Sequence, residues 1–296
     1  MEPELKVLQL PDGPLCYREA GPGEAPVLLC LHGFPESWLA YEALMPRLSH
    51  RFRLIVPDQR GFNRSLKPDG VEAYHARYLT ADMFALADHV SPGRPIFLMG
   101  HDWGSAVAYA MAFRRPERIA RLVIANGVHP WCFQRAIIED EGQRAASQYM
   151  NRLRADDAET LLAADGFARL IRMMEGFSDT PWLNADLKQR YVDQWSEPGA
   201  LTGMLNWYRS SPVLVPGIGE AAPVVPLLAA PRDTMRVAMP HMVLWGDADT
   251  ALRPACLEGL GNFAADLTIR NVEGAGHWIL HERPDVVASA MLTFLI

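Results

Sequence analysis

The 296-residue sequence is poor in cysteine. Its four cysteines are widely scattered, at Cys16, Cys30, Cys132 and Cys256. This spacing excludes a disulfide framework and matches no metal-ligand pattern. We therefore expect reduced cysteines that serve in packing, in a cytoplasmic protein without a metal site.

Long apolar runs and an excess of positive charge are also missing. Charges, prolines or glycines interrupt every apolar stretch before it reaches the length of a transmembrane helix. Residues 1–4 are acidic and lack the basic and apolar regions of a signal peptide. The net charge of −7 and the pI near 5.7 give no electrostatic footprint for nucleic acid. We expect neither a membrane nor a nucleic-acid partner.

Short apolar segments alternate with helical patterns, at the composition of an ordinary globular protein (49% hydrophobic, 21% charged). An opening hairpin is expected at 5–10 and 15–19, and buried strands at 27–31, 53–56, 96–99, 119–125, 241–245 and 267–272. Helices are expected at 38–48, 78–90, 105–114 and 284–295. This alternation predicts an α/β fold with a mostly parallel central sheet and helices on both faces. An active site is then expected at the carboxyl ends of the strands.

The strand pattern stops between residues 129 and 237. Helical patterns cover 135–153, 158–174, 185–195 and 199–209, and a proline-rich, irregular segment follows at 212–231. We therefore predict a core made of residues 1–129 and 238–296, and an all-helical cap of residues 130–237. This cap is inserted late in the chain and is large enough to cover the site.

The predicted strand at 96–99 runs into Gly100-His101-Asp102-Trp103-Gly104, which has the form of a nucleophile elbow. The glycines allow close backbone approach around a strained turn, so that the central side chain projects from the sheet. That side chain is a carboxylate, Asp102. A carboxylate that attacks an alkyl carbon forms an alkyl ester, which differs from the acyl transfer of a serine. The alternative is that Asp102 merely caps the following helix.

A nucleophile follows a middle strand, an acid follows a later strand and a histidine follows the last one, which is the chain order of α/β-hydrolases. Five motifs carry this order: His32-Gly33-Phe34-Pro35, the elbow itself, Asn206-Trp207-Tyr208-Arg209, Gly246-Asp247-Ala248-Asp249 and Gly276-His277-Trp278. Together they resemble the epoxide hydrolases of the α/β-hydrolase fold, over essentially the whole chain. The resemblance implies an enzyme that needs no cofactor and that acts on a small epoxide, as a monomer or a homodimer.

By this resemblance, Asp102 attacks the less hindered epoxide carbon, and His277 activates the water that hydrolyses the resulting ester. The backbone N–H groups of Phe34 and Trp103 are expected to hold the oxyanion. The side chains of these two residues are equally suited to the pocket wall.

An acid should hold Nδ1–H of the histidine and stabilise the imidazolium. Asp249 and Asp247 compete for this role, and the family's Gly-x-x-Asp spacing from Gly246 selects Asp249. Some relatives supply the acid after the strand at 119–125. Here that loop offers Asn126, which carries no charge.

The resemblance also implies two cap tyrosines that protonate the epoxide oxygen. Tyr208 matches the second of them, and Tyr149 is the predicted first, although an aromatic residue there also suits the buried face of a cap helix. Tyr191 is a lower-ranked candidate.

Aromatic residues elsewhere in the cap favour a hydrophobic substrate; they are Trp131, Phe133, Trp182, Trp195 and Trp207.

Histidines outside this set are expected to be structural. His101 should pack or form a hydrogen bond under the elbow, His32 should anchor the oxyanion loop, and His129 should lie at the entry to the cap. Asn63 replaces a glycine of the family's loop after the strand at 53–56. Because asparagine tolerates a left-handed backbone, we expect this turn to survive.

Two alternatives stay open. A haloalkane or haloacid dehalogenase uses the same aspartate, histidine and acid, and Trp103 would suit a halide site. However, Phe34 replaces the asparagine that would supply a side-chain donor, and the Tyr208 motif favours epoxides. A non-catalytic ligand-binding protein of this fold would be expected to have a broken triad, and here the three residues are intact.

Overall fold

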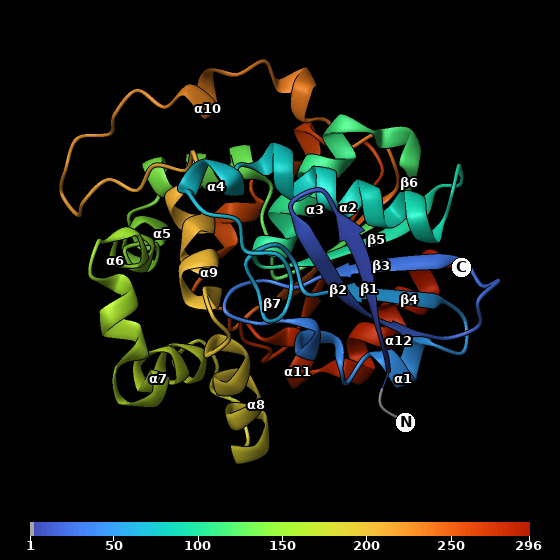
Figure 1. The fold of residues 1–296 in the computed structure, drawn as a ribbon. Helices are drawn as coiled ribbons and strands as arrows, with labels where there is room; N and C mark the ends of the chain where they lie inside the picture. The colour runs from blue at the N-terminus through green and yellow to red at the C-terminus, as the bar shows by residue number, and fades with distance from the viewer. Residues whose placement is uncertain (1–2) are drawn as a thin grey trace.

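The computed structural model describes residues 3–296 and has an eight-stranded sheet at its centre (Figure 1). The strands are β1 (Glu4–Leu10), β2 (Gly13–Ala20), β3 (Val27–Leu31), β4 (Arg53–Pro57), β5 (Ile96–His101), β6 (Ile119–Ala125), β7 (His241–Gly246) and β8 (Leu267–Val272). Their spatial order is β1-β2-β4-β3-β5-β6-β7-β8. The β1–β2 hairpin and the β2–β4 pair are antiparallel, whereas all later pairs are parallel. The predicted mostly parallel sheet is confirmed.

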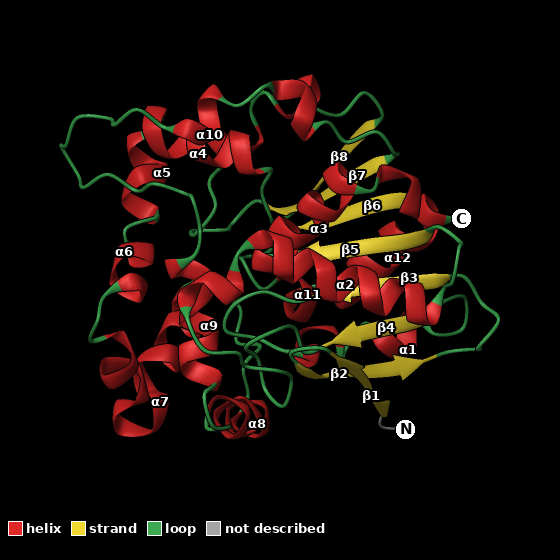
Figure 2. Cartoon of the chain, turned by 45° about the horizontal axis from the view of Figure 1, so that its top comes forward, coloured by secondary structure: helices red, strands yellow, loops and turns green. Residues whose placement is uncertain are grey.

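Helices cover both faces of the sheet (Figure 2). Helices α2 (Ala76–Val90) and α3 (Trp103–Arg114) lie on one face, and α1 (Met45–Leu48) and α12 (Pro284–Leu295) lie on the other. Every residue of β3 and β7 is buried, because both of their faces are covered. This explains why these two strands read as continuous apolar runs in the sequence.

The chain between β6 and β7 is mainly helical. It contains α4 (Pro130–Glu139), α5 (Glu141–Ala146), α6 (Tyr149–Arg154), α7 (Ala158–Gly176), α8 (Ala185–Trp195), α9 (Ala200–Arg209) and α10 (Pro226–Ala229). The stretch 211–225 within the predicted irregular segment has no helix or strand. Helices α5 to α9 lie together beyond one end of the sheet, and the arrows of β4 and β5 point towards them (Figure 2). The helical insertion therefore faces the edge where the strand carboxyl ends meet.

Three helix predictions are wrong. The segment predicted as one helix at 158–174 lies within α7, but its backbone is non-helical at residues 164–167, so it consists of two helices joined at a kink. The segment predicted as one helix at 38–48 is a 3-10 turn, Trp38–Tyr41, followed by the short α1, because the Ser37 hydroxyl accepts the N–H of Leu39 and starts a separate turn. The segment 135–153 is divided among α4, α5 and α6. It breaks at Asp140, whose backbone is extended and whose carboxylate caps α5 through the N–H of Gln143.

All four cysteines are buried and unpaired. None of the helices in residues 3–296 combines the length and apolar character needed to cross a bilayer. Asn63 has a φ of 43° and donates a hydrogen bond to Asp58 Oδ2 at 2.9 Å, so the predicted left-handed turn is confirmed.

Candidate active site

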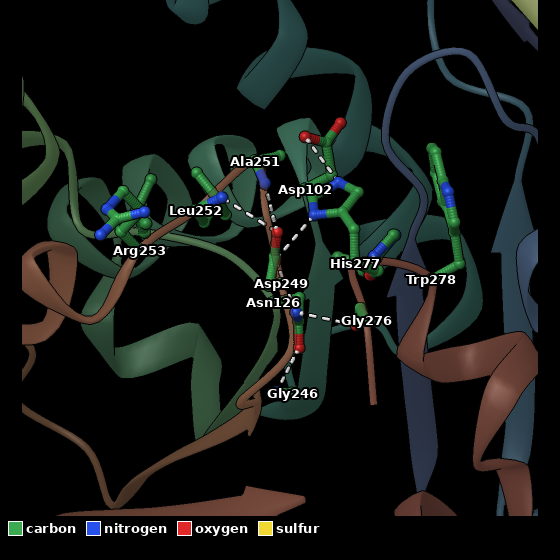
Figure 3. A network of polar contacts seen from close by, with 12 residues as sticks. Asp102, Asn126, Gly246, Asp249, Ala251, Leu252, Arg253, Gly276, His277 and Trp278 are labelled. Atoms are coloured by element: carbon green, nitrogen blue, oxygen red, sulfur yellow. Dashed lines mark hydrogen bonds and ion pairs between the residues drawn. The ribbon is translucent and has the colours of Figure 1, made fainter. Parts of the chain in front are cut away.

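Polar side chains gather at the carboxyl ends of four neighbouring strands. Asp102 follows β5, Asn126 follows β6, Asp249 follows the end of β7, and His277 lies in the loop after β8. These strands are parallel and adjacent in the sheet, so the loops that follow them meet at one edge. Figure 3 shows the carboxylates of Asp102 and Asp249 on either side of the His277 ring.

The imidazole of His277 contacts both carboxylates. Its Nδ1 lies 2.8 Å from Asp249 Oδ2, a hydrogen-bond distance, and its Nε2 lies 3.6 Å from Asp102 Oδ2. In the neutral imidazole, a hydrogen bond from Nδ1–H to Asp249 fixes the tautomer in which Nε2 is unprotonated, and this Nε2 faces Asp102. The predicted nucleophile, base and acid are thus brought together in one line of contacts.

Asp102 has a backbone that an L-residue rarely adopts, with φ 49° and ψ −123°. It stands at the N-terminus of α3, but its side chain makes no capping hydrogen bond, so the capping interpretation is wrong. Instead, Asp102 Oδ1 accepts the N–H of Phe34 at 2.7 Å. Gly33 leaves room for this carboxylate, because a Cβ at Gly33 would overlap it. The strained turn therefore holds the carboxylate free of the helix and against the Phe34 N–H.

Backbone and side-chain donors hold Asp249. Its Oδ1 accepts the N–H groups of Ala251 and Leu252 at 2.8 and 2.9 Å, and its Oδ2 accepts Asn126 Nδ2 at 2.6 Å. Sequence reasoning treated Asn126 only as an uncharged residue and missed it as a donor. The rejected candidate Asp247 is exposed, and its carboxylate accepts the N–H of Gly274 in the loop after β8.

The Asn126 amide also ties two site loops together. Its Nδ2 donates to Gly276 O at 3.2 Å, and its Oδ1 accepts the N–H of Gly246 at 2.8 Å. The loop that carries His277 and the strand end before Asp249 are therefore fixed to the same side chain.

Electrostatics in this cluster favour the charged imidazole. Burial would lower the pKa of His277, but the negative charges of Asp249 and Asp102 raise it to about 10. Burial would likewise raise the pKa of Asp249, yet the His277 charge and the donors around it hold this pKa below its usual value. The two neighbouring carboxyl groups thus stabilise a positive charge on the His277 imidazole.

Two phenols lie next to this cluster. Tyr208 on α9 is buried, and its ring packs edge-on against Phe34 and Trp103 at centroid distances of 4.9 and 5.0 Å. Tyr149, the first residue of α6, lies with its ring centroid 6.2 Å from that of Tyr208. Tyr149 and Asp102 line the same cavity of about 70 Å³. Burial and the charge of Asp102 raise the pKa of both phenols well above 10, so both stay protonated.

Tyr191, the lower-ranked tyrosine, lies elsewhere. Its hydroxyl donates to Glu36 Oε1 at 3.0 Å, and its ring stacks on Trp195. It does not line the cavity that holds Asp102.

Close packing of two glycines fixes α9, and with it Tyr208. A Cβ at Gly203 would lie 2.6 Å from the Cα of Gly61, so the backbones of α9 and of the loop after β4 touch. Gly61 itself has a φ of 91°. The indole of Trp207 donates to Arg60 O at 2.9 Å in the same loop. The Asp58–Ser65 loop therefore fixes the position of α9 through this backbone packing and this hydrogen bond.

A buried polar cluster behind the site was not predicted. Glu36 Oε1 lies 2.8 Å from His281 Nε2, and its Oε2 lies 3.0 Å from His101 Nδ1. His101 Nε2 donates to the carbonyl of His277 at 2.9 Å, as expected of a hydrogen-bonding residue under the elbow. Burial would raise the pKa of Glu36, but the two imidazoles lower it. The available signal was the position of Glu36 directly after His32-Gly33-Phe34-Pro35.

His32 anchors the loop before Phe34, as predicted. Its Nδ1 bonds to Gly33 O at 2.9 Å, and its Nε2 accepts the N–H of Gln59 at 3.1 Å. Gln59 Nε2 in turn donates to His32 O at 2.6 Å.

Comparison with known proteins gives consistent results. Residues 26–284 match the family described as the alpha/beta hydrolase fold. The chain is 32% identical over 279 residues to an AB hydrolase superfamily protein of Bacillus subtilis, covering 93% of this chain and 92% of that protein. It is 30% identical over 301 residues to epoxide hydrolase 2 of Caenorhabditis elegans, covering 98% of this chain and 79% of that protein.

A solved structure from work on epoxide hydrolases of hot-environment metagenomes is also similar. It superposes with a TM-score of 0.87 at 36% sequence identity, over 100% of this chain and 99% of that one.

Proposed function

We propose that this chain, which belongs to the α/β-hydrolase fold family and to the epoxide hydrolases within it, opens a small hydrophobic epoxide to a vicinal diol. One observation carries the proposal: two phenols that stay protonated, Tyr149 and Tyr208, lie beside the carboxylate of Asp102, the nucleophile that we propose. An epoxide needs both groups, because its oxygen is a poor leaving group unless an acid donates to it.

In the first step, one Asp102 oxygen attacks the less hindered ring carbon. The carbon–oxygen bond of the ring breaks, and the epoxide oxygen takes a proton from one of the two phenols. The product is a neutral hydroxyalkyl ester on Asp102, with one tyrosine left as the phenolate.

Formation of the ester changes the charge of the site. The Asp102 carboxylate contributes to the raised pKa of His277 and of both phenols. When this charge is consumed, the pKa of the phenols falls, which favours proton donation to the opening ring. The pKa of His277 falls as well, which favours the neutral imidazole that acts as a base in the second step.

In the second step, His277 Nε2 takes a proton from water, and the hydroxide attacks the ester carbonyl carbon. The backbone N–H of Phe34, which already donates to Asp102 Oδ1, and that of Trp103 stabilise the oxyanion. The acyl carbon–oxygen bond then breaks and the diol leaves. One water proton ends on the diol oxygen, the other restores the tyrosine, and the water oxygen stays on Asp102.

We infer that residues 130–237 act as a cap over this chemistry. Both phenols come from this segment, whereas the nucleophile, base and acid come from the core. Exclusion of water by such a cap strengthens the electrostatic interactions within the site.

A halide-releasing enzyme is the main competing function. The Trp103 ring, whose indole would be expected to hold a halide, packs edge-on against the Tyr208 ring at a centroid distance of 5.0 Å. Since Tyr208 is one of the phenols that donate to the epoxide oxygen in our mechanism, this contact supports the epoxide reaction. The test is a mixed panel of small epoxides and haloalkanes, scored for diol and for free halide. We expect diol without halide; halide without diol would overturn the proposal, and neither product would favour a ligand-binding protein.

Heavy-oxygen water tests the role of Asp102 directly. In a single turnover with enzyme in excess, we expect the diol to contain no heavy oxygen and the Asp102 peptide to gain it. Label in the diol after one turnover would mean that water attacks the epoxide itself, and it would contradict the ester intermediate.

A further inference from the structure

A second cavity, of about 390 Å³, adjoins the small cavity that holds Asp102. We call it the apolar chamber; it lies between α3 on one side and Trp207, Leu227 and Met235 on the other. The two cavities share the lining residues Trp103, Ala106, Pro130 and Val213. The wall between them is therefore thin, and Ala106 contributes only a methyl group to it.

The chamber exists because one face of α3 is left unfilled. Trp103, Ala106, Ala110 and Phe113 recur at every third or fourth residue, which places them on one helix face. All four are half-buried, whereas Ala108 on the opposite face is completely buried. The methyl groups of Ala106 and Ala110 are too small to reach the insertion across the cavity.

The lining suits an apolar ligand. Apart from Arg114, which is exposed at the end of α3, no charged side chain lines the chamber. The hydroxyl of Ser210 already donates to Tyr74 O at 3.0 Å. The chamber therefore offers a ligand mainly burial of apolar surface.

We propose that the apolar chamber binds the long hydrocarbon substituent of a terminal epoxide whose ring lies at Asp102. This assignment rests on the proposed function and names its substrate class. The chamber runs along α3, which begins directly after Asp102, so a substituent on the ring has a short path into it across Ala106. Trp103 lines both cavities, so its side chain lies between the epoxide ring at Asp102 and the substituent in the apolar chamber.

The size of the chamber sets the length of the substituent. An α-helix rises 1.5 Å per residue, so Ala110 lies about 12 Å along the axis from Asp102, a span that an extended chain of about nine carbons covers. Short epoxides fit into the small cavity and gain nothing from the chamber. Each methylene that enters it should raise kcat/KM by about two- to fourfold.

The test compares 1,2-epoxybutane with 1,2-epoxydecane. For the wild-type protein we expect kcat/KM to be at least about tenfold higher for the longer epoxide. Ala110→Phe fills the chamber from α3 and should lower this ratio at least about tenfold. Ala110→Val, a smaller change that keeps the helix intact, should lower the ratio less. Ala145→Phe, on an exposed position of α5 outside both cavities, is the matched control and should keep the wild-type ratio.

The outcomes separate the two proposals. Absence of diol from both epoxides in the wild-type protein would contradict the proposed function. Hydrolysis of both epoxides at similar kcat/KM, or a long-to-short ratio that Ala110→Phe and Ala110→Val leave at the wild-type value, would overturn the chamber assignment and leave the proposed function standing.

Discussion

Tyr149 and Tyr208 have different surroundings although both lie beside Asp102. Tyr208 is held by rings from three residues, Phe34, Trp103 and Tyr149. Tyr149 is half-buried at the start of α6 and packs on Phe177. In our mechanism, either phenol can donate to the epoxide oxygen, so the loss of one leaves the other in reach.

Replacement of these phenols should therefore be strongly non-additive. We expect Tyr149→Phe and Tyr208→Phe each to lower kcat only about 10-fold. The double variant should lower it by at least about a thousandfold, which exceeds the roughly 100-fold loss that two independent effects would give. Tyr191→Phe is the matched control, since this phenol bonds to Glu36 and not to the site. Steady-state kinetics on one epoxide measures all four variants. A double variant with the kcat of either single variant would contradict a shared role.

Sequence reasoning found the site residues that stand in motifs and missed those that act across the fold. Asp102, Asp249 and His277 each follow a strand, so their meeting was predictable from the parallel sheet. Glu36 and His281 meet only in three dimensions, and no spacing in the chain indicates their contact.

At the scale of elements, the packing of α9 against the loop after β4 determines the position of Tyr208. Gly203→Ala would drive a Cβ to 2.6 Å from Gly61 Cα, and neither backbone can yield easily. We expect a loss of about 1–3 kcal/mol in the free energy of unfolding and a fall in kcat, because α9 must shift. Urea unfolding and kinetics measure the two effects.

Gly176→Ala gives the control for that change. Gly176 is the last residue of α7, and a Cβ there would meet no atom within 4 Å. We expect a gain of up to about 1 kcal/mol in the free energy of unfolding and no change in kcat. Equal behaviour of the two alanine variants would show that the contact between Gly203 and Gly61 does not position Tyr208.

Strands were more predictable than helix breaks. Buried apolar runs bounded by turns identified β3 to β8 to within two residues at each end. The breaks between α4, α5 and α6 depend on Asp140 and on the Gln143 side chain, which donates to Ser147 Oγ and to Ala251 O of the core. Contacts with a distant segment produce no hydrophobic periodicity in the sequence, so helix breaks that depend on them cannot be predicted from it.

For the whole molecule, buried histidines set the response of stability to acid. Burial lowers the pKa of His32, His129 and His241 to about 4. The unfolded chain takes up these protons near pH 6.5 and the folded chain does not, so stability falls as the pH drops from 6.5 towards 4. Burial raises the pKa of Asp58 to about 6, so this group makes stability rise as the pH drops through 6. Its effect is opposite to that of the three histidines and is smaller, because it is a single group.

The alkaline side of the profile should depend on His277. Its pKa of about 10 lies above the unfolded value of 6.5, so its stabilisation is complete below pH 6.5 and is lost as the pH rises towards 10. We therefore expect the free energy of unfolding to be greatest near pH 6.5 and to decline by a few kcal/mol by pH 10. Urea unfolding at a series of pH values measures this profile.

Asp102→Asn tests the origin of the alkaline decline. It removes one of the two charges that raise the pKa of His277, so the decline should become smaller and end at a lower pH. The variant must be verified by mass, because the new amide can revert to the carboxylate. Asp247→Asn, at an exposed carboxylate that accepts the N–H of Gly274, should keep the wild-type profile. An Asp102→Asn profile identical to wild type would mean that the Asp102 charge does not act on His277, and it would remove the reason for His277 to become a base when the ester forms.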